Sequence, residues 1–197
     1  MNRIKTPLDF ETIRKLKAGD QVSLSGVLFT GRDAAHKRLV DTYLAGQELP
    51  VDLRGQVIYY VGPCPAKPGK VIGSAGPTTS IRMDPYTPLL VRELGLRGMI
   101  GKGHRSQKVV DVIKEEGAIY FLTIGGAAAL LAQRIKKAEV VAYPEFGPEA
   151  IYRLEVEDFP LIVGVDSDGR SAYDEGQSKY RLIHSVVGSG ETLENRR

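Results

Sequence analysis

Short apolar segments that end in glycine alternate with amphipathic segments through most of the chain. Residues 56–63 (QVIYYVGP) form an apolar run that a glycine stops, whereas residues 106–117 (SQKVVDVIKEEG) place Val109, Val112 and Ile113 on one helical face. Parallel strands need crossover connections, and helices usually supply them. The alternation therefore predicts an α/β fold with a largely parallel sheet.

The same patterns predict the positions of the elements. We expect helices at residues 6–19, 33–44, 89–95, 106–117 and 127–138, and strands at residues 22–29, 56–63, 69–76, 97–103, 118–126 and 139–147. Asp33 is the expected cap of the second helix, so Arg32 lies at a strand-to-helix turn. From Ala150 onward we expect two β-rich runs, joined by a turn at Asp168-Gly169 or its neighbours.

Length and composition indicate one globular domain. The 197 residues are 42% hydrophobic and 26% charged, which is near the average for proteins with a packed core. We expect one domain over residues 1–187, with a β-rich C-terminal part, and a polar tail over 188–197. No apolar run approaches the roughly 20 residues that span a bilayer, and the first residues contain no apolar leader, so we expect a cytoplasmic protein.

Charge and cysteine content exclude several classes of function. The net charge of +3 is spread along the chain, which is too little for a nucleic-acid footprint. The single cysteine, Cys64, excludes an internal disulfide framework and fits a reducing compartment. It also excludes an iron–sulfur cluster held by this chain alone, because such clusters need three or four thiolates.

Three glycine-flanked turns carry the candidate functional residues. They are residues 31–33, 76–82 and 101–104, and each follows a predicted strand. Ligands of α/β sheets bind at the carboxyl ends of strands, so Arg32, Arg82 and Lys102 are expected to meet Thr78 and Thr79 in one pocket. Such a pocket suits a compact dicarboxylate, since arginine offers a planar fork to carboxylate oxygens. The alternative is that the glycines only turn the chain and the cations are solvated.

The other motifs are weaker. Leu96 stands where a P-loop needs its first glycine, and no segment completes a dinucleotide-binding glycine pattern. The three histidines lie too far apart in sequence for metal-ligand spacing, so we expect no metal ligands in this chain. His36 lies one turn into the helix beside Arg32, where its ring can face the same pocket.

Four segments resemble the β subunit, or C-terminal domain, of class I iron–sulfur-dependent fumarate hydratases and L(+)-tartrate dehydratases. The segments are GRDAAHKR, YYVGPCP, VIGSAGPTTSIRMDPYTP and GMIGKG, in the order and spacing of that family. The resemblance implies a swivelling β/β/α domain. It also implies a partner α subunit that holds a [4Fe–4S] cluster, with an α2β2 assembly expected, and reversible hydration of fumarate to L-malate.

The resemblance also implies roles for individual residues. Arg32, Arg82 and Lys102 resemble substrate-carboxylate ligands, Thr78 resembles the catalytic base, and Thr79 a neighbouring substrate contact. A threonine hydroxyl is a weak base, and the charge of Lys102 can stabilise the anion that forms when a proton leaves carbon. Because the chain lacks a cysteine-bearing portion, we expect it to be inactive alone.

Alternative functions stay open at this point. An L(+)-tartrate dehydratase β subunit fits the same motifs. A non-catalytic dicarboxylate-binding module, a hydrolase with Thr78 as nucleophile, and a phosphohistidine carrier through His36 or His104 are further possibilities. A cluster-bearing partner would distinguish an enzyme subunit from a stand-alone dicarboxylate-binding module.

Overall fold

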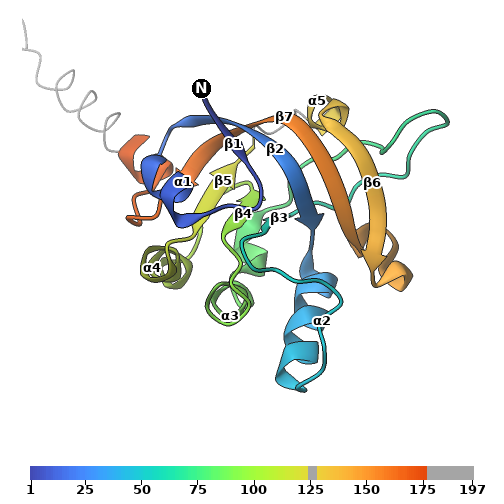
Figure 1. The fold of residues 1–197 in the computed structure, drawn as a ribbon, viewed down its shortest axis with the longest axis horizontal. Helices are drawn as coiled ribbons and strands as arrows, with labels where there is room; N and C mark the ends of the chain where they lie inside the picture. The colour runs from blue at the N-terminus through green and yellow to red at the C-terminus, as the bar shows by residue number, and fades with distance from the viewer. Residues whose placement is uncertain (124–127, 177–197) are drawn as a thin grey trace, which may run out of the picture.

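The computed structural model describes residues 1–123 and 128–176 (Figure 1). The strands are β1 (Asn2–Lys5), β2 (Gln21–Thr30), β3 (Val57–Tyr59), β4 (Gly98–Gly101), β5 (Ile119–Leu122), β6 (Ile135–Ala142) and β7 (Ile151–Val165). The helices are α1 (Phe10–Lys15), α2 (Asp33–Leu44), α3 (Thr87–Arg92), α4 (Gln107–Glu116) and α5 (Ala128–Gln133), with 3-10 turns η1 (Ser80–Met83) and η2 (Pro144–Glu149). No helix within these residues is long and apolar enough to cross a membrane.

Five strands close into a mixed barrel. β2, β3, β4 and β5 pair in parallel in that order, and β7 runs antiparallel to both β2 and β5, which joins the two ends. β1 extends the sheet alongside β2, and β6 extends it alongside β7. The predicted α/β class is confirmed, and β2 to β5 are parallel as a largely parallel sheet requires. The sheet as a whole is mixed, because β7 is antiparallel to its neighbours, and its closure by β7 was not predicted.

Alternate residues of the central strands serve two separate cores. Tyr59 and Phe121 point into the barrel, where they join Phe159 of β7. Their neighbours Ile58 and Tyr120 face outward and pack against α2, α3 and α4. These three helices lie on one side of the barrel in Figure 1. The parallel strands are therefore buried on both faces, which explains their continuous apolar sequences.

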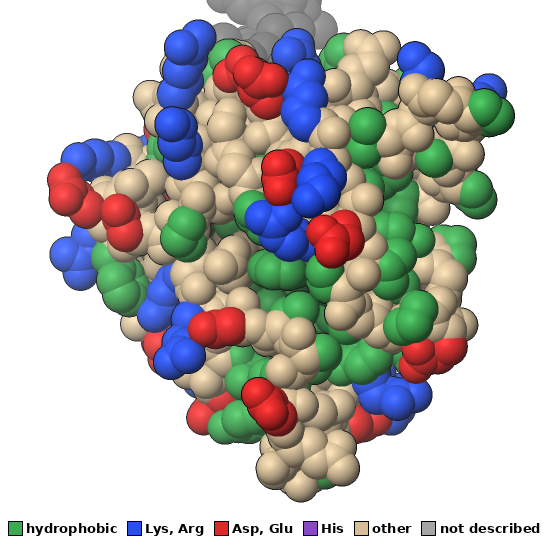
Figure 2. Space-filling view, turned by 45° about the vertical axis from the view of Figure 1, so that its right-hand side comes forward, with side chains coloured by type: hydrophobic (Ala, Val, Ile, Leu, Met, Phe, Trp, Pro, Cys, Tyr) green, Lys and Arg blue, Asp and Glu red, His purple; other side chains and the backbone are tan. Residues whose placement is uncertain are grey.

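The outer face of β6 and β7 is a ladder of alternating charge. Lys137 lies opposite Glu155, and Glu139 lies opposite Arg153. Figure 2 brings this side of the molecule forward and shows acidic and basic side chains next to each other. Charged side chains on an edge strand such as β6 discourage further strand pairing.

Several predicted boundaries are wrong. The first helix begins at Phe10, because the Asp9 side chain accepts the Thr12 N–H at 2.7 Å, and it ends at Lys15 rather than Gly19. The predicted strand at 69–76 is a loop. It folds back on itself through hydrogen bonds from Cys64 N–H to Ser74 O (2.9 Å) and from Gly73 N–H to Cys64 O (3.1 Å).

The predicted helix at 127–138 is also too long, and its first residue lies outside the described part. α5 ends at Gln133, and the basic residues Lys136 and Lys137 belong to β6, because pairing with β7 overrides their helix propensity. Beyond Ala150, one 15-residue strand, β7, precedes the predicted turn, in which Gly169 N–H donates to Asp166 O at 2.9 Å. β1 was not predicted, and the tail at 188–197 lies outside the described residues.

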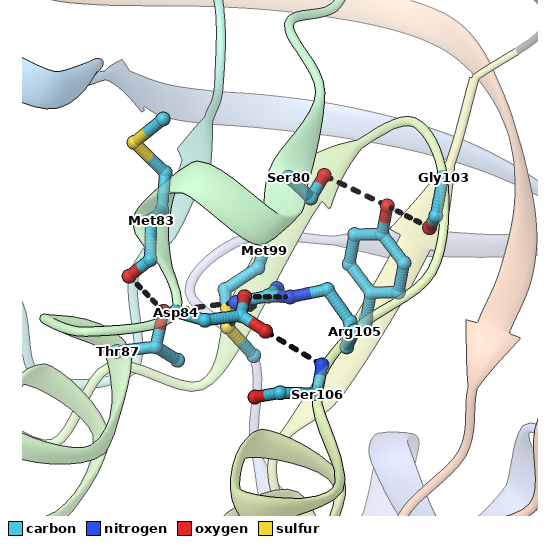
Figure 3. A network of polar contacts seen from close by, with 9 residues as sticks. Ser80, Met83, Asp84, Thr87, Met99, Gly103, Arg105 and Ser106 are labelled. Atoms are coloured by element: carbon cyan, nitrogen blue, oxygen red, sulfur yellow. Dashed lines mark hydrogen bonds and ion pairs between the residues drawn. The ribbon is translucent and has the colours of Figure 1, made fainter.

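A buried ion pair fixes the loop after β4 against the turn after η1 (Figure 3). Arg105 Nε donates to Asp84 Oδ1 at 2.7 Å, and the side chains are 0% and 8% exposed. Asp84 Oδ2 accepts the Ser106 N–H at 2.6 Å, and Arg105 Nη2 donates to Thr87 Oγ1 at 2.8 Å. Each charged group therefore has further hydrogen-bond partners, which a buried ion pair requires.

A second set of contacts ties the same two segments together. The Tyr120 hydroxyl donates to Gly103 O at 3.0 Å and lies 2.8 Å from Ser80 Oγ, which leaves the serine hydroxyl to donate to Tyr120. Ser80 packs so closely on Gly101 that a Cβ at position 101 would lie 2.0 Å from Ser80 Oγ. Only glycine fits at the end of β4.

Asp84→Asn should lower the free energy of unfolding by about 3–5 kcal/mol. The change removes the counter-charge of a buried guanidinium and keeps the side-chain shape. Urea denaturation followed by circular dichroism measures the loss.

Asp52→Asn is the matched control. It removes the same charge from the exposed Asp52–Arg54 pair, whose side chains are 64% and 81% exposed. We expect this control to cost less than about 1 kcal/mol. Equal urea midpoints for the two variants would contradict the role assigned to Asp84.

Candidate functional site

The three glycine-flanked turns lie side by side at the carboxyl ends of β2, β3 and β4. Gly31 N–H donates to Tyr59 O at 3.1 Å, which joins the first turn to the end of β3. Thr78 N–H donates to Tyr60 O at 2.7 Å, and Ser80 N–H donates to Lys102 O at 2.9 Å. The middle turn therefore lies between the other two, although it follows a loop rather than the predicted strand.

Thr79 and Lys102 lie on the same face of this edge. They form an isolated parallel bridge, and both side chains are exposed, whereas the neighbouring Ser80 and Gly101 are buried. Residues paired in a ladder share a face of the sheet. Thr78 is partly buried. Within the described residues the Lys102 side chain has no ion pair.

Arg32 lies at the N-terminus of α2, at the position that precedes the first helical residue. Its guanidinium packs against Gly62, where a Cβ would lie 2.8 Å from Nη1. Nη2 is 3.4 Å from Glu149 Oε1, and the side chain is 25% exposed. Its Nε–H is buried and unpaired within the described part of the chain.

Arg82 extends from η1 to the first turn of α2. Its Nε and Nη2 donate to the two carboxylate oxygens of Asp33 at 3.1 and 2.7 Å. Half of the Arg82 side chain stays exposed. Asp33 was predicted to cap α2, but it is the first helical residue and its side chain binds Arg82 instead. This ion pair joins the first turn to the middle turn.

His36 is completely buried behind Arg32. Its Nδ1 lies 2.8 Å from Arg32 O, and Nδ1 carries the hydrogen because a carbonyl oxygen only accepts. The ring packs edge-on against Tyr60, with centroids 5.3 Å apart. Burial lowers the pKa of His36 to about 4. The Arg105 charge lowers this pKa further, whereas the hydrogen bond to Arg32 O raises it in part. The histidine is therefore neutral at pH 7.

Sequence reasoning missed two acidic residues at this edge. Asp84 lies two residues after the middle turn, and its buried partner is Arg105. The available signal was that Arg105, a charged residue, closely follows the apolar strand at 97–103 and had been given no role. Glu149 lies 117 positions after Arg32, and no pattern in the sequence connects them. Such long-range pairs appear only when the barrel closes.

The described residues contain no group of three or more histidine, cysteine or acidic side chains that could hold a metal ion. Cys64 is exposed and free. His104, the other histidine considered for phosphate transfer, is exposed and lies against Tyr173, with ring centroids 4.2 Å apart. The three turns thus bring cationic and hydroxyl side chains to this edge, a set that binds small anions, and carboxylates lie beside two of the cations, Arg32 and Arg82.

Several known proteins are similar to this chain in sequence. A family model described as Fumarase C-terminus matches residues 2–176. A class I fumarate hydratase of Escherichia coli, described as anaerobic, is 46% identical over 156 residues, which cover 79% of this chain and 28% of that protein. A protein of Geobacillus stearothermophilus, named provisionally as a class I fumarate hydratase, is 43% identical over 87% of this chain and 33% of its own length.

A shorter relative matches over most of its length. A Methanocaldococcus jannaschii protein, named provisionally as an L(+)-tartrate dehydratase subunit beta, is 37% identical over 182 residues, or 89% of this chain and 93% of that protein. The chain thus spans about a third of the class I fumarate hydratases and nearly all of this subunit. Because the family model covers residues 2–176, the chain belongs to the Fumarase C-terminus family.

Proposed function

We propose that this chain is the β subunit, or β-type domain, of a class I fumarate hydratase that reversibly hydrates fumarate to L-malate. The observation that supports the proposal is that the turns carrying Arg32, Arg82, Lys102 and the Thr78-Thr79 pair lie side by side at one sheet edge, in a chain of this family. The relatives are named as hydratases and a dehydratase, so the reaction class is a hydro-lyase.

The charge at the site supports a shared active site. Arg32 lies beside Glu149 and Arg82 pairs with Asp33, so each arginine has a carboxylate of this chain next to it. Lys102 is the cation without such a partner among the described residues. A dicarboxylate substrate carries two negative charges, so a second polypeptide or domain that adds positive charge would complete the site.

The chain does not fit the cluster of this enzyme class. A [4Fe–4S] cluster needs several thiolates, and Cys64 is the single cysteine. We therefore assign the cluster to a partner α subunit, or to the part of the longer relatives that this chain lacks. A swivelling β/β/α domain in an α2β2 assembly remains the arrangement that we propose.

The residues of this chain then have distinct roles. Arg32, Arg82 and Lys102 bind and polarise the substrate carboxylates, and Thr79 contacts the substrate from the same face as Lys102. Thr78 removes the proton from carbon during dehydration and returns it during hydration. Lys102 stabilises the negative charge that develops on the adjacent carboxylate.

Tartrate is the second candidate substrate. The specific observation in its favour is the relative named as an L(+)-tartrate dehydratase subunit beta, which is 37% identical to this chain over 182 residues. Sequence identity favours fumarate, because the chain is 46% identical to a fumarate hydratase and 37% identical to the tartrate dehydratase relative. Both reactions remove water next to a carboxylate and use the same residues of this chain.

We assign His36 to the support of Arg32 rather than to substrate binding. The ring is fully buried and its Nδ1–H holds the Arg32 carbonyl. The folded protein keeps His36 neutral down to a pKa of about 4, whereas the unfolded chain protonates it near pH 6.5. The stability contributed by neutral His36 is therefore present above pH 6.5 and is lost as pH falls toward 4.

The wild-type chain should lose about 3 kcal/mol of unfolding free energy through His36 between pH 7 and pH 4, given about 1.4 kcal/mol per pKa unit. His36→Asn cannot be protonated and can still donate to Arg32 O. The difference in unfolding free energy between the wild type and this variant should therefore narrow by that amount as the pH falls from 7 to 4. Urea denaturation at half-unit pH steps measures it. Parallel stability curves would contradict the assignment of a depressed pKa.

Activity should require both polypeptides. The chain, purified with its candidate cluster-bearing partner and reconstituted without oxygen, should consume fumarate, measured as loss of absorbance, while each chain alone should not. Thr78→Ala should lower kcat roughly 100-fold or more, because the proton acceptor is lost. Arg32→Ala should raise KM, and Lys102→Ala should raise KM and also lower kcat, because Lys102 stabilises the developing charge. Lys108→Ala, an exposed lysine on α4, is the matched control and should leave both constants unchanged.

Two outcomes would change the proposal. Turnover of tartrate but not fumarate by the reconstituted pair would identify the chain as a tartrate dehydratase β subunit. Turnover of neither acid, with fumarate still bound, would identify a non-catalytic dicarboxylate-binding module.

A further inference from the structure

Glu149, at the end of η2, places its carboxylate between Arg32 and the first turn of α2. Oε1 lies 3.4 Å from Arg32 Nη2, and Oε2 accepts the Ala34 N–H at 3.2 Å. The Arg32 and Glu149 side chains are 25% and 28% exposed, so both are largely shielded from water. Neither the motifs of the sequence nor the roles proposed above account for this residue.

The first turn of α2 needs an acceptor from elsewhere. The initial N–H groups of a helix have no partner within the helix, and a Ser, Thr, Asp or Asn at the cap position usually accepts from them. Arg32 holds that position, and its guanidinium can only donate. Glu149 supplies the missing acceptor, and its negative charge suits the helix N-terminus.

The segment that carries Glu149 is held on both sides. Before it, the Arg38 guanidinium of α2 lies over the rings of Tyr143 and Phe146, 5.7 and 5.4 Å from their centroids. After it, Thr30 Oγ1 donates to Ala150 O at 3.1 Å and accepts the Tyr152 N–H at 2.9 Å. Thr30 ends β2, two residues before Arg32. The segment that carries Glu149 is thus fixed to the same strand-to-helix turn that the Glu149 carboxylate faces.

We propose that Glu149 is a positioning residue, which holds the Arg32 guanidinium in the orientation that binds a substrate carboxylate. A guanidinium has five N–H donors, and Glu149 faces one of its nitrogens, so donors remain for a second carboxylate. Glu149 does not touch substrate and acts through Arg32. The inference rests on the proposed function, because it presumes that Arg32 binds a dicarboxylate.

Steady-state kinetics of the reconstituted pair give the first test. Glu149→Ala should raise KM for the dicarboxylate roughly ten-fold while kcat changes less than about three-fold, because binding is lost more than chemistry. Glu149→Gln keeps an oxygen for the Ala34 N–H and should recover part of the loss. Glu145→Ala is the matched control: it lies in η2, pairs with Arg38 at 4.0 Å and is 55% exposed, and it should leave KM unchanged.

The Arg32 side chain gives a second readout that needs no activity. In the full chain, the Nε–H signal of Arg32 can be assigned in nitrogen-15 NMR spectra by its loss in Arg32→Lys. Glu149→Ala should shift this signal and speed its hydrogen exchange, whereas Glu145→Ala should do neither. If Glu149→Ala instead disturbed the local fold, amide signals across α2 and β7 would also shift, and the Arg32 signal would shift no more than they do.

Three results would overturn the inference. A lower KM in Glu149→Ala would show that Glu149 competes with substrate. An unchanged Arg32 signal would show that Glu149 does not hold the guanidinium, and a shifted signal with unchanged KM would show that the orientation does not matter. If the wild-type pair turns over neither fumarate nor tartrate, the proposed function fails, and the NMR comparison alone decides whether Glu149 positions Arg32.

Discussion

The Asp84–Arg105 ion pair is the interaction on which the candidate site depends. Removing two charges from water costs several kcal/mol each, and their mutual attraction offsets that cost only when further contacts satisfy the remaining polar groups. Here these contacts come from Thr87, from the Ser106 N–H and from the Tyr120 ring, whose centroid lies 4.9 Å from the guanidinium. Because Asp84 follows η1 and Arg105 follows β4, this compensation holds the middle turn and the Lys102 loop together.

The barrel explains why the turns that carry the candidate site residues lie at one edge. β2, β3 and β4 are parallel neighbours, so the chain leaves all three at the same end. Each strand gives alternate residues to the barrel interior and to the layer of helices, and few side chains of the strands themselves remain for chemistry. The turns therefore carry the reactive groups, and the strands determine where the turns lie.

The sequence predicts the local features well and the long-range ones poorly. The periodicity of residues 106–117 and the apolar run at 56–63 correspond to α4 and β3, because packing follows those patterns directly. The patterns did not show that residues 135–138 form part of a strand, since that strand, β6, exists only through pairing with β7. Turn chemistry and a parallel sheet predicted that the turns of Arg32, Arg82 and Lys102 share one edge of the sheet, and the structure has these turns side by side. The pairing of Arg82 with Asp33 and of Arg32 with Glu149 was not predicted, because side-chain pairing across the fold leaves no local pattern.

β7 has a consequence for how the chain folds during synthesis. It pairs with β2, β5 and β6, and its contact with β2 joins Val22 to Leu161. Pairing across so long a stretch of chain must meet a large entropy cost before any contact forms, which slows folding. Until the ribosome has released β7, the edges of β2 and β5 that later pair with it are unpaired and can template association with other chains. The strand that completes the barrel thus also ends the period in which a nascent chain is most prone to aggregate.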